Sequence, residues 1–511
     1  MIQQEASPRT QNSVLIAVLC LFALTMVVRV VPAWFLNAEV ADLISYCDMA
    51  DAALRGDNIY ARHVLFPYTP WSLFIPATMS RLAEVLGWRF DFVVKLPSCL
   101  ADGFTTVLIF CGLSALGHSR RQSLGWSLCW ALNPVAILTS AFHGNLMATI
   151  PCLVTGALVA APGFVARHRR ALLLTVSAML LGLAIAMRSF PVLMLPLFLF
   201  FATRTVREAI LFTLTAVYAS ALSTLPYLIY APQTFLREVF GYTGTPDFGW
   251  ASIVRTMAHL SGGPMVSLFH YQPLLQMSKW LFLTSFAIVL LSLPFFGRGA
   301  LSRVLLLPPL LFYGLYGGVA AQYLVWVIPM AILGRQYFVL AFSAVATVTM
   351  IAFYLLYHPQ ILFGWYPVHI EPTRALFLWY AWCNGVLVLT SIAWILRIVI
   401  AEFLSGSDAQ DRDGWPALFD RPPLRWACIV LVLLFSALWS YLALSCIHGA
   451  NEAYRAAIAG PKIASTVGDD ESQGNVVSLV QRCGLARGPR PCRMSGRGHS
   501  AAGPKWHHRP Q

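Results

Sequence analysis

Apolar runs long enough to cross a bilayer recur along most of this 511-residue chain, and they limit its fold more than any other feature. Membrane hydrocarbon offers no hydrogen-bond partner to a backbone, so about 20 consecutive apolar residues cross it as a helix. Charged residues make up 11% of the chain, whereas a soluble domain has about 25%. The sequence therefore predicts an all-α, polytopic integral membrane protein and excludes a soluble enzyme, a disordered regulator and a secreted disulfide scaffold.

The apolar runs predict about 13 transmembrane helices, of which Phe190–Ala202 and Tyr323–Leu333 are short for a crossing. The predicted segments are Ser13–Leu36, Phe92–Leu116, Ser123–Ala141, Leu146–Pro162, Ala171–Met187, Phe190–Ala202, Ala209–Tyr230, Trp280–Phe296, Leu301–Gly318, Tyr323–Leu333, Tyr337–Tyr357, Ala375–Val399 and Trp426–Ile447.

Clusters of arginine fall in every second connection between these segments. Cytoplasmic loops are the ones that carry such excess positive charge, so the alternation predicts one orientation for the whole chain. The remaining connections are then extracytoplasmic. They include an outer loop over residues 37–91, with an interface helix at residues 72–86, and a second over residues 231–279. Residues 1–450 form one multi-pass domain, and residues 451–511, rich in Gly, Pro and Arg, are predicted to be a disordered tail.

Polar residues near the bilayer boundary converge on the predicted outer face. A carboxylate beside several cations at this depth is typical of a site for an anionic lipid, because Arg and Lys bind phosphate. The carboxylate can serve as a general base toward a sugar hydroxyl. The candidate catalytic residue is Asp42, and the candidate binding residues are Lys95, His143, Asn145, Arg188, Gln322 and Tyr323.

Several of these residues also have a structural interpretation. Asp42 fits a solvated loop acid or a helix cap, in which case Asp48, or less well Asp51, is the base. Lys95 fits a side chain that extends to the interface. Arg188 fits an anchor at the lipid headgroups, although it lies on the outer side, against the positive-inside trend.

The same alternatives hold for the aromatic and turn positions. His143 fits an ordinary turn histidine, and Tyr323 with Trp326 fits an aromatic belt. Asp102 lies about 10 Å deeper than Lys95 at 1.5 Å per helical residue. For Asp102 we expect a structural pairing with an Arg or Lys, since an isolated charge at that depth is costly.

Short motifs stand along the chain in the order found in one class of membrane enzymes. They are Asp42-Leu43-Ile44-Ser45-Tyr46, Gly56-Asp57-Asn58-Ile59-Tyr60, Pro67-Tyr68-Thr69-Pro70, Trp130-Ala131-Leu132-Asn133-Pro134, His143-Gly144-Asn145, Gly182-Leu183-Ala184, Arg188-Ser189-Phe190-Pro191 and Gln322-Tyr323-Leu324-Val325-Trp326. Together they resemble the GT-C superfamily of polyprenyl-phosphate-sugar-dependent glycosyltransferases. Within it the chain is similar to the catalytic mannosyltransferase subunit of GPI-anchor assembly and to bacterial mannosyltransferase relatives.

The resemblance implies an inverting transfer of mannose or another hexose from a polyprenyl-phosphate-linked donor. The acceptor would be a glycan or glycolipid at the extracytoplasmic face. It also implies Asp42 as the catalytic base, Arg188 as a phosphate ligand where relatives have Lys, and Gln322 and Tyr323 as residues lining the site.

The chain departs from this pattern at two further positions. Ile44 stands where the GPI enzyme has the second acid of Asp-x-Asp, so a need for a divalent cation stays open and we assign no metal ligand. Leu146-Met147-Ala148 supplies no acid after the Gly-Asn pair, where relatives often have one.

Two other functions stay open at this stage: a transporter or flippase of lipid-linked sugars, and a non-catalytic accessory subunit. A transporter predicts charges near the midplane and an internal repeat. Asp102 is the one charged residue predicted to lie near the midplane, and the sequence shows no repeat. The basic clusters report orientation and do not indicate nucleic-acid binding. Compact loops and the absence of an ER-retention ending favour a bacterial inner membrane, with the ER membrane as the eukaryotic equivalent.

Overall fold

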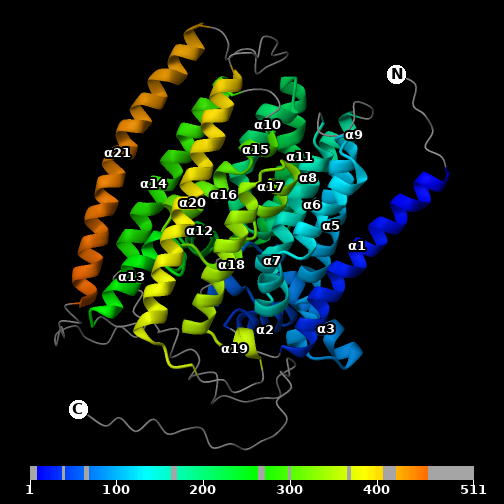
Figure 1. Ribbon diagram of the computed structural model, residues 1–511, viewed down its shortest axis with the longest axis horizontal. Coiled ribbons are helices and arrows are strands. Elements are labelled where there is room, and N and C mark those ends of the chain that lie inside the picture. Colours follow the sequence, from blue (N-terminus) through cyan, green and yellow to red (C-terminus); the bar gives the residue numbers. More distant parts are fainter. Residues whose placement is uncertain are drawn as a thin grey trace, which may run out of the picture.

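The computed structural model describes residues 8–36, 41–62, 68–162, 170–262, 271–296, 301–364, 370–406 and 422–458. Within these ranges the chain is helical apart from its connections, and strand-like pairing is limited to one bridge between Phe248 and Val319. The helices lie side by side, with α1 at one edge of the bundle and α21 at the opposite edge (Figure 1). The predicted all-α fold is confirmed for the described chain.

The α-helices are α1 (Pro8–Phe35), α2 (Ala41–Leu54), α3 (Trp71–Leu86), α4 (Phe90–Val93), α5 (Leu96–Ala115), α6 (Arg120–Ala131), α7 (Pro134–Ile137), α8 (Thr149–Ala160), α9 (Arg170–Met187), α10 (Leu195–Ala202), α11 (Val206–Tyr230), α12 (Pro232–Phe240), α13 (Trp250–Leu260), α14 (Gln272–Ser292), α15 (Leu301–Val304), α16 (Leu307–Leu315), α17 (Ile328–Leu333), α18 (Phe338–Tyr357), α19 (Gln360–Phe363), α20 (Arg374–Gly406) and α21 (Pro422–Ile458).

Eight helical segments of the described chain are long and apolar enough to cross a membrane. A ninth candidate is bent by 40° between α6 and the helical stretch Pro134–His143, and four more apolar helices are shorter. The protein is therefore an integral membrane protein. Every one of the predicted segments is helical, but the number of them that cross the bilayer stays a prediction.

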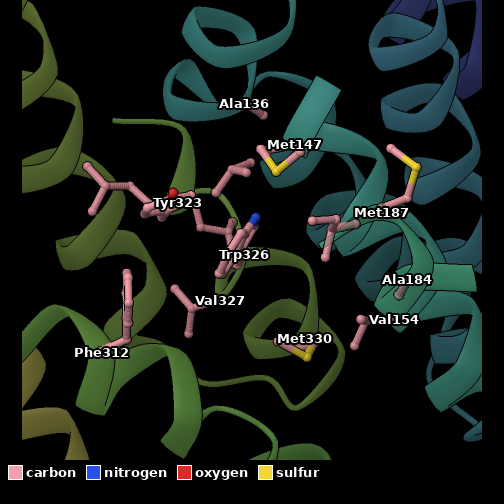
Figure 2. Packing of buried hydrophobic residues seen from close by; sticks show 14 of the residues in the cluster. Ala136, Met147, Val154, Ala184, Met187, Phe312, Tyr323, Trp326, Val327 and Met330 are labelled. Atoms are coloured by element: carbon pink, nitrogen blue, oxygen red, sulfur yellow. The ribbon is translucent and has the colours of Figure 1, made fainter. Parts of the chain in front are cut away.

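A buried core joins segments that are far apart in the sequence. Figure 2 shows Ala136 of α7, Val154 of α8 and Ala184 of α9 facing Phe312 of α16 and Met330 of α17. The helix pairs α1 and α5, α8 and α9, α9 and α11, α18 and α20, and α14 and α21 also pack together. The outward faces stay apolar, as a lipid-facing surface requires; examples are Leu214, Leu389 and Trp382.

An ion pair is buried between α1 and α5. Arg29 Nε lies 2.5 Å from Asp102 Oδ2, and both side chains are inaccessible to solvent. Arg29 also donates to the carbonyl of Ala131, 2.7 Å away, which satisfies part of the remaining guanidinium. The predicted structural pairing of Asp102 is confirmed, and it ties α1, α5 and the end of α6 together.

Several of the predicted cytoplasmic arginines connect helix ends. Arg170 Nε lies 2.8 Å from Glu208 and joins the starts of α9 and α11, while Arg303 pairs with Glu402 and joins the start of α15 to the end of α20. The alternation of arginine clusters along the sequence predicts that all of these helix ends lie on the cytoplasmic side. Two further contacts of this kind are Arg120 with the Ser13 carbonyl and Arg335 with His118.

The predicted first outer loop contains more helix than the sequence suggested, because α2 occupies residues 41–54. The predicted interface helix is present as α3, which buries Ser72 and Leu73 and exposes Phe74 and Val85. α2, α3 and α19 lie at one end of the bundle, away from α10 and α15 (Figure 1). At the C-terminus α21 continues through residues 451–458, and the rest of the predicted tail lies outside the described residues.

Candidate active site

Asp42 forms a compact polar cluster with His143 and Asn145. His143 Nε2 lies 2.7 Å from Asp42 Oδ2, and Asn145 Nδ2 donates to the same oxygen at 2.6 Å. The Asp42 side chain is 26% exposed. Among the residues that the structure describes, Oδ1 receives no hydrogen bond, so one carboxylate oxygen is held in place and the other can accept a proton.

The hydrogen bonds determine the charge of Asp42 and which ring nitrogen of His143 carries a proton. Burial opposes ionisation of Asp42, but the hydrogen bonds from His143 and Asn145 outweigh it and hold the pKa of the carboxyl below its usual value. An ionised carboxylate only accepts hydrogen bonds, so Nε2 carries the proton. In the neutral ring Nδ1 then accepts from the Tyr354 hydroxyl at 3.0 Å.

A break in the helical chain brings His143 and Asn145 to Asp42. Asn133 ends α6 and caps α7, since its side chain accepts from the amides of Val135 and Ala136. A π-helix, Leu138–His143, follows and stops at Gly144, which has φ +74°. Asn145 then begins the next turn by accepting from the Met147 amide. Helix caps that the sequence supplies thus aim two side chains at α2.

Lys95 lies beneath this cluster and supports it. Its side chain is fully buried, and Nζ donates to the carbonyls of Leu36 and Phe142 at 3.2 and 3.4 Å. Its methylene stem passes so close to Gly144 that a Cβ there would meet it at 2.8 Å. The ammonium group of Lys95 therefore contacts Phe142, the residue before His143. Lys95 does not line the pocket that contains Arg188.

Arg188 directly follows α9, and the first outer loop holds the end of that helix. Thr69 Oγ1 donates to the Ala186 carbonyl, and Ser72 Oγ donates to the Met187 carbonyl at 2.7 Å. The last carbonyls of a helix have no partner within it. Thr69 and Ser72 satisfy two of them and fix the direction in which Arg188 leaves α9.

The Arg188 guanidinium lies among tyrosines. It donates to the Tyr323 hydroxyl at 2.9 Å, and its centre is 4.8 Å from the Tyr68 ring and 5.4 Å from the Tyr242 ring. Aromatic faces stabilise a guanidinium at such distances without neutralising it. The side chain is 7% exposed, so a positive charge is retained in a largely dry surrounding.

A pocket with an empty volume of about 780 Å³ opens beside Arg188. Its wall is mainly apolar and aromatic, and Lys279 of α14 supplies a second cation. Lys279 also donates to the Phe240 carbonyl at the end of α12. The wall includes Phe190, Leu193, Val239, Phe240, Tyr242, Phe282, Leu283, Phe312, Tyr316, Tyr323 and Trp326.

Tyr46 and Tyr68 connect the Asp42 cluster to Arg188. The Leu146 amide donates to the Tyr46 hydroxyl at 3.2 Å, and the Tyr46 and Tyr68 ring centroids are 6.5 Å apart. Burial raises the pKa of Tyr68, Tyr46 and the Asp42 carboxylate raise it further, and Arg188 opposes them. Asp42 and Arg188 therefore both affect the pKa of Tyr68, in opposite directions.

Most, but not all, of these residues were named as candidates from the sequence. Asp42, His143 and Asn145 meet directly, and Arg188 meets Tyr323, whereas Gln322 is half-buried in the turn Ala321–Tyr323. Lys279 was missed as a pocket residue because it marked only the boundary of a loop. Its position after an outer loop, at the start of an apolar run, was the available signal. Within the described ranges, no group of three or more His, Cys, Asp or Glu residues could hold a metal ion.

No family model matches the sequence, and no curated protein matches it. The chain is similar to the crystal structure of ArnT from Cupriavidus metallidurans bound to undecaprenyl phosphate, over 85% of this chain and 77% of that chain, with 15% identity and a TM-score of 0.43. A likeness at this level carries no argument about the activity or the ligand of this chain.

Gly144 tests the local geometry. Gly144→Ala should lower the free energy of unfolding by roughly 1–3 kcal/mol, because residue 144 has a left-handed backbone that a Cβ disfavours and the Cβ would also meet the Lys95 stem. Gly87→Ala is the matched control, since Gly87 has φ +64° and nothing within 4 Å of its built Cβ. Thermal unfolding in detergent should show the larger loss for Gly144→Ala, and equal losses would contradict the assigned contact.

Proposed function

We propose that the protein is an integral membrane glycosyltransferase that transfers a hexose, with mannose as the first to test, from a polyprenyl-phosphate-linked donor. The acceptor is a glycan or glycolipid at the extracytoplasmic face, and the anomeric configuration inverts. One observation supports this most strongly: Asp42 is connected through Tyr46 and Tyr68 to Arg188, which with Lys279 lines a pocket with apolar walls. The motifs that resemble the GT-C class agree with the same chemistry.

Asp42 is the general base in this proposal. Oδ1 accepts the proton of the acceptor hydroxyl while that oxygen forms a bond to the anomeric carbon of the donor. The bond from that carbon to the phosphate oxygen breaks at the same time, and the polyprenyl phosphate leaves with the electron pair. His143 and Asn145 hold the carboxylate through Oδ2, which keeps Oδ1 oriented for the transfer.

The pocket beside Arg188 suits the leaving group. A phosphate monoester carries negative charge, and guanidinium and ammonium groups in a low-dielectric surrounding stabilise that charge more strongly than in water. The polyprenyl chain is apolar and needs aromatic and aliphatic walls, which Phe240, Phe282 and Leu283 provide. The same pocket thus matches both halves of a polyprenyl phosphate.

A transporter of lipid-linked sugars is the main competing function. Its expected midplane charge, Asp102, is neutralised by Arg29 and inaccessible to solvent, which leaves that residue no evident role in carrying a substrate. Neither a transporter nor an accessory subunit would need a base, so substitution of Asp42 separates the enzyme from both.

The decisive experiment compares wild type with Asp42→Asn, using purified protein, radiolabelled polyprenyl-phosphate-mannose and extracted cell glycolipids. We expect transfer to fall about 10²- to 10⁴-fold in the variant, because general base catalysis contributes about this much. Asp48→Asn is the control, since Asp48 lies on the same helix, α2, and is exposed. Binding of undecaprenyl phosphate should be unchanged in both variants.

Each other outcome contradicts a specific part of the proposal. Equal transfer by wild type and Asp42→Asn would reject Asp42 as base, and loss in Asp48→Asn would move the role there. No transfer by wild type with mannosyl and other hexosyl donors would reject the enzyme in favour of a transporter or accessory subunit.

The cations of the pocket should control affinity for the lipid phosphate. Arg188→Met should weaken binding of undecaprenyl phosphate roughly 10- to 100-fold, which is the usual cost of losing a hydrogen bond to a charged group. Lys279→Met should have a smaller effect because Lys279 is only half-buried. Arg237→Met is the control, since Arg237 on α12 is 60% exposed and pairs with Glu238. Equal affinities across all variants would place the phosphate elsewhere.

The hydrogen bond to His143 should set the acid limit of activity. Burial opposes ionisation of Asp42, and His143 provides the largest opposing contribution that lowers the pKa. His143→Ala removes it, so the pKa of Asp42 rises and the carboxylate becomes protonated at higher pH. The acid limb of the transfer rate should therefore move to higher pH than in wild type. A lower rate with an unshifted limb would show that His143 acts only through packing.

A further inference from the structure

A second polar cluster lies outside the pocket and the Asp42 group. Arg255 Nη1 of α13 lies 2.9 Å from Asp247 Oδ1, and Thr245 Oγ1 donates to the other carboxylate oxygen at 2.5 Å. The Arg255 guanidinium centre is 4.8 Å from the Tyr357 ring. His358 follows directly after α18 and is half-buried. Residues from the α12–α13 connection, α13 and the end of α18 thus meet in one place.

The end of α18 connects this cluster to the proposed catalytic site, because the Tyr354 hydroxyl is hydrogen-bonded to His143 at 3.0 Å and the Tyr357 ring lies 4.8 Å from the Arg255 guanidinium centre. Burial raises the pKa of Tyr242, and the carboxylates of Asp247 and Asp42 both add to that rise, while Arg188 opposes it. Burial lowers the pKa of His358, helped by His143 and opposed by Asp247 and Asp42. The carboxylates of Asp42 and Asp247 therefore both affect the pKa of Tyr242 and the pKa of His358.

The charge balance of the cluster differs from that of the Arg188 pocket. Asp247 and Arg255 neutralise each other, whereas Arg188 and Lys279 both contribute positive charge to the pocket. Asp247 is nevertheless 20% exposed, so its carboxylate can still accept hydrogen bonds from a ligand. A paired carboxylate, a neutral imidazole and tyrosines bind hydroxyl groups, and they have no excess charge for an ion.

The connection that carries Asp247 is held rigidly. The Phe248 amide donates to the Val319 carbonyl at 2.9 Å, and the Gly249 amide donates to Asn384 Oδ1 at 2.8 Å. Trp250 Nε1 donates to the Leu315 carbonyl at 3.0 Å. Gly249 has φ +76°, which permits this close approach of the connection to α16. A site built on this segment is preorganised, which reduces the entropic cost of binding.

We propose that Asp247, Arg255 and His358 form the binding site for a neutral sugar ring of the acceptor. The inference rests on the proposed function, because it assigns the cluster to the acceptor whose hydroxyl Asp42 would deprotonate. Asp247 accepts hydrogen bonds from ring hydroxyls, Arg255 holds Asp247, and His358 binds a further hydroxyl. The site selects uncharged sugars over those that carry a carboxylate or an amino group.

Binding and turnover test this assignment separately. Saturation-transfer NMR on the full chain in lipid nanodiscs, with methyl α-hexopyranosides as probes, should detect ring protons in contact with wild type. The signal should be lost in the double variant Asp247→Asn, Arg255→Gln, which removes both charges together and leaves neither one buried alone. Glu371→Gln, at an exposed acid of the same outer region, is the control and should keep the signal.

In turnover with extracted glycolipids, the double variant should raise the acceptor KM roughly 10- to 100-fold, the range expected for hydrogen bonds to a charged group. Hydrolysis of the donor by water should stay at the wild-type rate, because Asp42 and Arg188 are intact. His358→Gln should raise the same KM less, and it keeps the assignment testable if the double variant does not fold.

Two results would overturn the inference. The first is an unchanged NMR signal or KM in the variants, and the second is absence of a signal with neutral hexosides while glucuronide or aminosugar probes give one. Failure of the proposed function itself looks different, since wild type would then neither transfer nor hydrolyse the donor.

Discussion

The site depends on the requirement that every interruption of a helix in apolar surroundings be satisfied by the chain itself, because lipid supplies no hydrogen bonds. The break after α6 shows how this works. Asn133 accepts from two amides of α7, and its own amide donates to Ser343 on α18 at 3.0 Å. Asn145 caps the next turn and also donates to Asp42. The residues that make the break tolerable also join three regions of the bundle and present His143.

The end of α9 follows the same physical rule. Its final carbonyls are occupied by Thr69 and Ser72, which belong to the first outer loop. The loop is therefore attached to the helix that carries Arg188, and the Tyr60 hydroxyl fixes it further by donating to the Tyr68 carbonyl at 2.7 Å. Two separate helix ends, after α9 and after the π-helix, thus position the cation and the carboxylate by satisfying backbone groups.

The sequence predicted the helical segments well because the length of an apolar run is a strong signal. It also named Asp42, His143 and Asn145 as candidates, and the structure shows that His143 and Asn145 are both hydrogen-bonded to Asp42. It missed α2, since a polar amphipathic helix between spans has no such signal. It could not show which way Lys95 extends, because a lysine at a span end can reach outward or fold inward; in the structure its stem packs against Gly144. Lys279 and the Asp247–Arg255 pair depend on how distant segments pack, which spacing along the chain does not reveal.

The distribution of charge is compatible with both the proposed base and the proposed phosphate site. A carboxylate in direct contact with a guanidinium would neutralise it and lose its own ability to accept a proton. The described neighbours of Arg188 include tyrosines, and burial raises the pKa of Tyr68 and Tyr242, so both remain neutral. Neutral phenols can donate to a phosphate and separate it from Asp42. The proposed leaving-group pocket, base and acceptor site thus differ in charge: Arg188 and Lys279 are cationic, Asp42 is anionic, and Asp247 and Arg255 form an ion pair.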